Sequence, residues 1–297
     1  MSEPAGPETL DVRTRDGWSL RADVHEPTRT LVGVAVLAHA AMARRTTFDR
    51  PEGAGAVQLL VDHGWRVIAF DFRGHGDSGP RGGQRGSWGY DELVLHDAPS
   101  VFAFAESRAV AGRPIAAVGH SLGGHVFLAA QGTGRTAFDS IVAVGASPWL
   151  RELESSTVRW LAKRAALRAA LAVCRRAGRF PARAMRLGSD DESRAFFQDF
   201  EGFSREGWRS RDRLEDYAAS LANVRCPVLQ IVSRGDRLLC APDCGARFVA
   251  LCGGPNAVHC VEEADGGGPP PTHMGLVTGP GVRDVWQRIE RWLRGER

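Results

Sequence analysis

Residues 114–124, PIAAVGHSLGG, place a serine between an apolar run typical of a buried strand and a pattern typical of a helix. At such a sharp strand-to-helix turn the serine backbone is strained. Glycines are needed two positions to either side because larger side chains would collide with the neighbouring strand or helix. The turn raises the hydroxyl above the sheet edge, toward the positive dipole end of the helix. The segment predicts a nucleophile at Ser121, and the alternative is a tight turn that carries an ordinary serine.

Similar apolar runs occur on both sides of this segment. Their apolar residues follow one another without the alternation of apolar and polar residues that is typical of half-buried strands. This pattern indicates strands that are covered on both faces, as in parallel sheets. The segments between them, at about 51–64, 90–111 and 122–134, are long enough for crossover helices. We therefore expect an α/β fold with a mostly parallel central sheet flanked by helices. The strands predicted in this part are Gly33–Ala40, Arg66–Phe72, Pro114–Gly119 and Ser140–Gly145.

Further strand patterns lie near both ends of the chain. Leu10–Arg15 and Trp18–Glu26 flank the turn-forming pair Asp16-Gly17 and predict an antiparallel edge hairpin. Strand-like runs return late, at Pro227–Val232 and Ala257–Val261. The late pair predicts that the sheet is completed after an interruption.

Residues 149–222 supply that interruption. They contain arginine-rich helical stretches and no strand-like run. One apolar stripe has helical spacing and predicts a single buried helix face: Trp160, Leu167, Leu171 and Cys174. We expect a core domain of residues 1–148 and 223–297, closed by a helix over 282–293, with residues 149–222 as a helical cap inserted before the last two strands.

The composition narrows the class of protein. The chain has 297 residues, of which 43% are hydrophobic and 25% charged, and this excludes a disordered chain, a collagen-like repeat and a small disulfide-stapled scaffold. A formal net charge of +3 is too small for a dedicated nucleic-acid binder. No apolar run reaches the roughly 18–20 residues of a membrane-spanning helix. The acidic, proline-containing N-terminus is unlike a secretory signal, so we expect a cytoplasmic protein.

The cysteines do not form a recognisable metal motif. Six cysteines without a secretory signal predict reduced thiols. Cys240, Cys244, Cys252 and Cys260 gather late in the chain, but none of them forms the CxxC pair with which zinc sites usually begin. We therefore expect small buried side chains and no metal.

A serine nucleophile needs a base, and the base needs a partner that fixes its tautomer. In this architecture the acid and the histidine follow the serine, each in the loop after a later strand. Asp236 lies just beyond the strand at 227–232, whereas Asp243, the alternative, falls in a predicted helix. Of the two later histidines, His259 lies within a strand and His273 lies in a loop before the final helix. The sequence predicts a Ser121–His273–Asp236 triad.

An oxyanion formed at the serine also requires hydrogen-bond donors. The backbone amide of Leu122, directly after the nucleophile, is one. The second is expected from the loop after the strand at 33–40, which contains His39-Ala40-Ala41-Met42. We assign it to the amide of Ala41, with that of Met42 as the alternative and Met42 also a candidate for the substrate pocket.

These motifs together resemble the α/β-hydrolase superfamily, and within it the lysophospholipase/monoglyceride-lipase-like and serine-aminopeptidase-like hydrolases. The resemblance rests on LAHA (37–40), DFRGHGDSG (71–79), GHSLGG (119–124), SRGD (233–236) and HMG (273–275). It implies that Arg73 is structural and that the insertion is a cap. The family often has His-Gly where this chain has His39-Ala40, which implies a slightly shifted oxyanion loop.

The sequence thus predicts a serine hydrolase that cleaves a small-molecule carboxylic ester through an acyl-enzyme, without metal or organic cofactor. A second alternative keeps the fold and the site but changes the reaction to acyl transfer or to cleavage of a thioester, amide or carbon–carbon bond, because a fold does not determine one function. A third alternative is a non-catalytic ligand-binding protein. Trp149, Trp160 and Phe196 of the cap are candidate pocket residues, and packing of the cap against the core is their alternative role.

The cap is strongly basic. Between residues 150 and 189 there are ten basic residues and two acids. One interpretation is a surface that contacts anionic lipid or an acidic substrate. The other is a solvated helix face in an arginine-rich protein.

Overall fold

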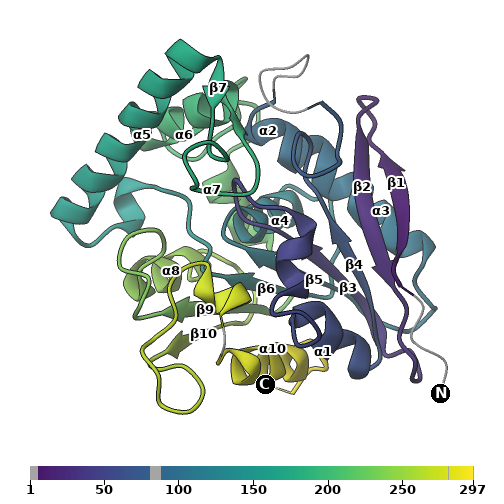
Figure 1. Ribbon diagram of the computed structural model, residues 1–297. Coiled ribbons are helices and arrows are strands. Elements are labelled where there is room, and N and C mark those ends of the chain that lie inside the picture. Colours follow the sequence, from purple (N-terminus) through teal and green to yellow (C-terminus); the bar gives the residue numbers. More distant parts are fainter. Residues whose placement is uncertain (1–5, 81–87, 280, 297) are drawn as a thin grey trace.

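The computed structural model in Figure 1 describes residues 6–80, 88–279 and 281–296. Its central feature is an eight-stranded sheet in the order β1-β2-β4-β3-β5-β6-β9-β10. β1 pairs antiparallel with β2 and β2 antiparallel with β4, while all other neighbours are parallel. The predicted mostly parallel sheet with an antiparallel edge hairpin is therefore confirmed. The strands are β1 (Glu8–Arg13), β2 (Ser19–His25), β3 (Gly33–Ala38), β4 (Trp65–Phe70), β5 (Ile115–His120), β6 (Ser140–Val144), β9 (Val228–Ser233) and β10 (Asn256–Val261).

The core lies on both faces of this sheet. In β3 every residue is buried, and neighbouring residues belong to different hydrophobic clusters, Val36 to one and Leu37 to the other. Alternate side chains of a strand point to opposite faces. The continuous apolar runs therefore arise because helices cover both faces, as the sequence indicated.

The helices divide between the two faces. The Leu37 face packs against α1 and α10 through Leu60 and Ile289, and the other face packs against α3 and α4 through Val101 and Leu128. Figure 1 shows α1 and α10 side by side below the sheet. The helices and helical turns are η1 (Arg45–Asp49), α1 (Ala56–Asp62), α2 (Tyr90–Glu92), η2 (Leu93–Asp97), α3 (Ala98–Ser107), α4 (Leu122–Gly132), η3 (Arg151–Leu153), α5 (Thr157–Ala177), α6 (Arg194–Glu206), α7 (Tyr217–Ser220), η4 (Leu221–Asn223), α8 (Pro242–Val249), α9 (Gly275–Thr278) and α10 (Arg283–Leu293).

Helices α5 and α6 are inserted between β6 and β9, before the last two strands, as predicted. The predicted stripe on α5 is buried along its whole length. The expectation of no strand in this segment is wrong in detail. β7 (Arg179–Phe180) and β8 (Glu192–Ser193) form a two-stranded antiparallel ladder. Two residues per strand are too few to leave an alternating pattern in the sequence.

The prediction that no secretory signal is present draws partly on residues 1–5, which lie outside the described residues. In the described ranges, no helix has both the length and the apolar character needed to cross a membrane.

Candidate active site

Ser121 occupies the turn between β5 and α4. Its φ of 51° and ψ of −111° lie outside the regions that a side chain prefers, and its amide donates to the Val144 carbonyl at 2.8 Å. A positive φ at a non-glycine residue costs of order 1–3 kcal/mol and persists only where the surrounding structure enforces it. The pairing of β5 with β6 and the packing of α4 enforce it here.

The glycines around Ser121 are required by close packing. A Cβ at Gly119 would lie 2.3 Å from backbone atoms of Gly123 and Gly124. A Cβ at Gly123 would lie 2.3 Å from the Ala38 carbonyl oxygen of the neighbouring strand. The helix can follow the strand this closely only because these side chains are absent, which is the physical reason for the GHSLGG pattern.

Asp236 and His273, predicted as acid and base, are in contact. Asp236 lies in the turn after β9, His273 lies just before α9, and Nδ1 of the ring is 2.5 Å from Oδ2 of the carboxylate. Burial raises the pKa of Asp236, but the hydrogen bond and charge of His273 and two backbone amides outweigh it, so the pKa lies below its usual value. The amides are those of Leu239, at 2.9 Å, and Cys240, at 3.0 Å. An ionised Asp236 keeps the proton on Nδ1 and leaves Nε2 with the lone pair.

His273 lies beside the serine turn. Its carbonyl oxygen accepts a hydrogen bond from Nε2 of His120, 3.1 Å away, the residue directly before Ser121. On the other side, a Cβ at Gly145 would lie 3.3 Å from the His273 ring, and Val144, next to Gly145, holds the Ser121 amide. Within the described residues, no hydrogen bond joins the Ser121 hydroxyl to the His273 ring. The two residues therefore lie at the same edge of the sheet.

His120 has a structural role. Burial lowers its pKa to about 3, so the ring is neutral, and its Nε2 donates to the His273 carbonyl. His120 thus ties the loop of the base to the strand of the nucleophile.

The predicted oxyanion loop, residues 39–42, is held by buried hydrogen bonds. Nδ1 of His39 donates to the Ala40 carbonyl at 2.7 Å, and its Nε2 accepts from the Phe72 amide at 3.0 Å. Within the described residues, the amides of Ala41 and Leu122, the two predicted donors, have no hydrogen-bond acceptor. Met42 has a φ of 59°, a strained conformation that the sequence did not predict.

The sequence analysis missed a pair of buried side chains that contacts this loop. Glu192 of the cap and His75 of the 71–79 motif are fully buried, with Nε2 of the ring 3.1 Å from Oε2 of the carboxylate. The same Oε2 accepts from the Met42 amide at 3.4 Å. Burial lowers the pKa of His75, but Glu192 outweighs it and raises the pKa to about 9. A signal was available, since 190–192 is an acidic run, Asp-Asp-Glu, directly after the basic part of the cap.

Of the candidate pocket residues of the cap, Phe196 packs inside the cap. Its ring contacts those of Phe197 and Phe200 at centroid distances of 5.6 and 4.6 Å. Trp160 is buried, and Nε1 of Trp149 donates to the Leu239 carbonyl at 3.3 Å, beside Asp236. The contacts of Phe196 favour packing, whereas those of Trp149 place it close to the loop of the acid.

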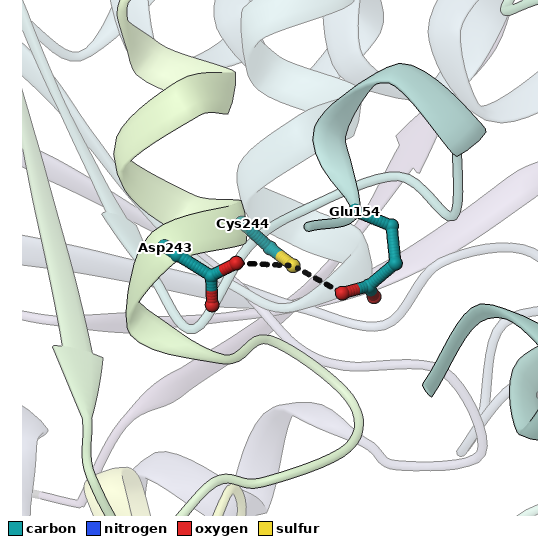
Figure 2. A group of neighbouring side chains, drawn as sticks. All are labelled: Glu154, Asp243 and Cys244. Atoms are coloured by element: carbon teal, nitrogen blue, oxygen red, sulfur yellow. Dashed lines mark hydrogen bonds between the residues drawn. The ribbon is translucent and has the colours of Figure 1, made fainter. Parts of the chain in front are cut away.

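Three neighbouring side chains outside the predicted triad have the kinds of donor atom found in metal sites. Glu154, Asp243 and Cys244 have ligand atoms within 4.8 Å of one another, and Figure 2 shows the thiol between the two carboxylates. Arg159 forms ion pairs with both carboxylates, and Lys163 pairs with Glu154 at 3.0 Å. Two positive charges already balance two negative ones, so the cluster is an ion-pair network that fastens α5 to α8. Asp243, the alternative triad acid, is occupied in this network.

The family model described as "Serine aminopeptidase, S33" matches residues 54–256, more than half of the chain. No curated protein matches the sequence of the chain. Three solved structures illustrate the likeness in fold. An esterase from Exiguobacterium antarcticum has a TM-score of 0.65 at 14% identity over 97% of this chain and 100% of its own. A thermophilic esterase from Thermogutta terrifontis with malate bound has 0.61 at 18% over 97% and 99%. DcsB in complex with its substrate analogue has 0.66 at 14% over 98% and 99%.

Proposed function

The chain belongs to the serine aminopeptidase S33 family of α/β hydrolases, and on that premise we propose that it hydrolyses a small-molecule carboxylic ester through an acyl-enzyme on Ser121. The solved structures of similar fold include esterases, and one of them was solved with a substrate analogue. The observation that carries the proposal is the buried Asp236–His273 pair beside a serine held in a strained strand-to-helix turn.

In the first half of the reaction, Nε2 of His273 removes the Ser121 proton as Oγ attacks the ester carbonyl. The charge that develops on the carbonyl oxygen meets the amides of Ala41 and Leu122 and the N-terminus of α4. In the part of the chain that the structure describes, these two amides have no other acceptor. Asp236 stabilises the imidazolium through the 2.5 Å hydrogen bond. The imidazolium then protonates the departing alcohol.

In the second half, water replaces the alcohol. His273 removes a proton from it, the hydroxide attacks the acyl carbonyl, and collapse of the second tetrahedral intermediate returns the proton to Ser121 and releases the acid. Each step uses side chains or amides of the chain itself.

We further propose that residues 1–148 and 223–297 form the hydrolase domain and that residues 149–222 form a cap over the site. Segment 188–192 supports this, since the amides of Ser189 and Asp190 donate to the Met42 carbonyl at 2.9 and 3.2 Å. The cap then covers the oxyanion loop and encloses part of the substrate. Candidate contributors to the acyl pocket are Met42 and Trp149.

The test is a panel of p-nitrophenyl esters of increasing acyl length, measured beside a matched thioester and a matched anilide. We expect turnover of at least one ester, slower turnover of the anilide, and no turnover above background by Ser121→Ala. Comparable turnover of the anilide would favour an amidase. Equal rates for wild type and Ser121→Ala would overturn the proposal.

A further inference from the structure

A groove of about 560 Å³ adjoins the candidate active site. Its lining includes Ala41 and Met42 of the predicted oxyanion loop, and Arg183 and residues 186–189 of the inserted segment. Met274, which directly follows His273, also lines it. A molecule in this groove therefore contacts the loop of the predicted oxyanion donors and the residue next to the predicted base.

The groove is positively charged. Its lining contains four arginines, Arg44, Arg50, Arg183 and Arg186, and no carboxylate. Arg44 is neutralised by Asp190 at 2.7 Å. Among the described residues, the guanidinium groups of the other three form no ion pair. Arg183 and Arg186 make their hydrogen bonds through main-chain atoms only. Three positive charges thus face the groove without a protein partner.

The backbone of the cap wall is held against the oxyanion loop. The Arg186 amide donates to the Arg183 carbonyl at 3.1 Å, so the two arginines share one tight turn, and Arg186 has a φ of 56°. A Cβ at Gly188 would lie 2.3 Å from the Met42 carbonyl oxygen, so only glycine permits this approach. A strained conformation at a non-glycine residue persists where the surrounding structure enforces it, and such residues cluster at ligand sites.

We propose that this arginine groove binds an anionic group of the substrate, a carboxylate or a phosphate, while the ester carbonyl lies at Ser121. Guanidinium groups bind both anions through paired, charge-assisted hydrogen bonds. The inference rests on the proposed ester hydrolysis and adds a substrate class to it: an ester that carries a negative charge on its acyl or alcohol part.

The concave shape of the site favours a small anion over an anionic membrane. Arg50, Arg183 and Arg186 are exposed, and they gather at a groove that also includes Ala41 and Met42, where a charged group of a substrate can reach them. A flat membrane would reach the exposed side of α5 equally well, where Arg168 and Arg175 lie outside the groove. These two residues supply a matched control, since they carry the same charge in the same cap outside the groove.

The experiment compares kcat/KM for neutral and charged esters of equal length. On the acyl side, p-nitrophenyl hexanoate is paired with mono-p-nitrophenyl adipate. On the alcohol side, butyl hexanoate is paired with 4-(hexanoyloxy)butanoate and with 4-(hexanoyloxy)butyl phosphate, which separates carboxylate from phosphate. We expect kcat/KM of at least one charged ester to exceed that of its neutral partner about tenfold, which corresponds to one additional charge-assisted contact. R183Q/R186Q should reduce this ratio to near one, and R168Q/R175Q should leave it unchanged.

Preference for the neutral ester in every pair, or an equal effect of the two double variants, would overturn the proposal. It is also overturned if R183Q/R186Q abolishes cosedimentation with phosphatidylglycerol vesicles while the ester ratio stays unchanged, because the arginines then serve a membrane. Titration calorimetry of the charged and neutral alcohol-side esters with Ser121→Ala measures the same preference without turnover. If the charged ester binds more tightly than the neutral one but the wild type hydrolyses neither, the proposed hydrolysis is contradicted and anion binding in the groove is supported.

Discussion

Replacing Glu192 by glutamine removes the charge that faces His75 and keeps the size of the side chain. Both residues are fully buried, and Nε2 and Oε2 lie 3.1 Å apart. In the wild type burial alone would lower the pKa of His75, but Glu192 reverses this and raises it from 6.5 to about 9. In Glu192→Gln burial dominates, so His75 loses its proton inside the folded protein.

The size of the effect follows from the pKa. The rise of the His75 pKa from 6.5 to about 9 contributes about 3 kcal/mol at pH 6, because one pKa unit is about 1.4 kcal/mol and His75 of the unfolded chain is not yet fully protonated at that pH. A pKa raised in the folded state stabilises the protein fully below pH 6.5, and this contribution is lost as the pH rises through about 9. Glu192→Gln should therefore be about 3 kcal/mol less stable than wild type at pH 6, and the difference should shrink toward zero by pH 10.

The assay is urea unfolding followed by tryptophan fluorescence at both pH values. Glu262→Gln is the control, since Glu262 forms an exposed ion pair with Arg234, and such pairs contribute about 0–1 kcal/mol. Only the difference between variant and wild type is interpreted, because Asp199, whose pKa burial raises to about 7, also titrates in this range. A loss of stability that is equal at pH 6 and pH 10, or no loss at pH 6, would show that Glu192 does not stabilise the protein through a protonated His75.

Three further predictions concern Asp236, the serine turn and the ion pairs of the inserted segment. Asp236→Asn should lower kcat about 10⁴-fold with little change in KM, as for the corresponding change in a serine protease, because the base loses its tautomer; steady-state kinetics with a normal kcat would contradict this. Gly123→Ala should lower the free energy of unfolding by about 1–3 kcal/mol, because the new Cβ collides with the backbone of β3. Gly202→Ala is the control, since the space around its Cβ is open, and it should leave the free energy of unfolding equal or higher by about 0.5–1 kcal/mol. Thermal unfolding measures both. Lys163→Met should destabilise the protein by about 3 kcal/mol because the buried carboxylate of Glu154 loses one of its cations, and urea titration with no change would count against the ion-pair network.

Local patterns predicted much of this molecule. The apolar runs fix the buried strands, and the glycines around Ser121 reflect contacts within a few residues of it or with the adjacent strand. Asp236 and His273 could be selected because each follows a strand in a parallel sheet, whose carboxyl ends share one edge.

The pairing of His75 with Glu192 could not be predicted in the same way. The two residues are 117 positions apart, and their contact depends on how the cap packs against the oxyanion loop. The left-handed conformation of Met42 has the same origin, since its carbonyl is fixed by amides of the cap. Sequence periodicity reports which face of an element is buried, not which distant polar group meets it.

The proposed hydrolysis requires that the Ser121 hydroxyl is the nucleophile and that His273 activates it. The most direct measurement is reaction of the wild-type protein with a fluorophosphonate, followed by mass spectrometry of the peptides. We predict a single adduct on Ser121, slowed strongly in His273→Ala and absent in Ser121→Ala. An adduct on another residue, or equal labelling of Ser121→Ala, would show that Ser121 is not the nucleophile.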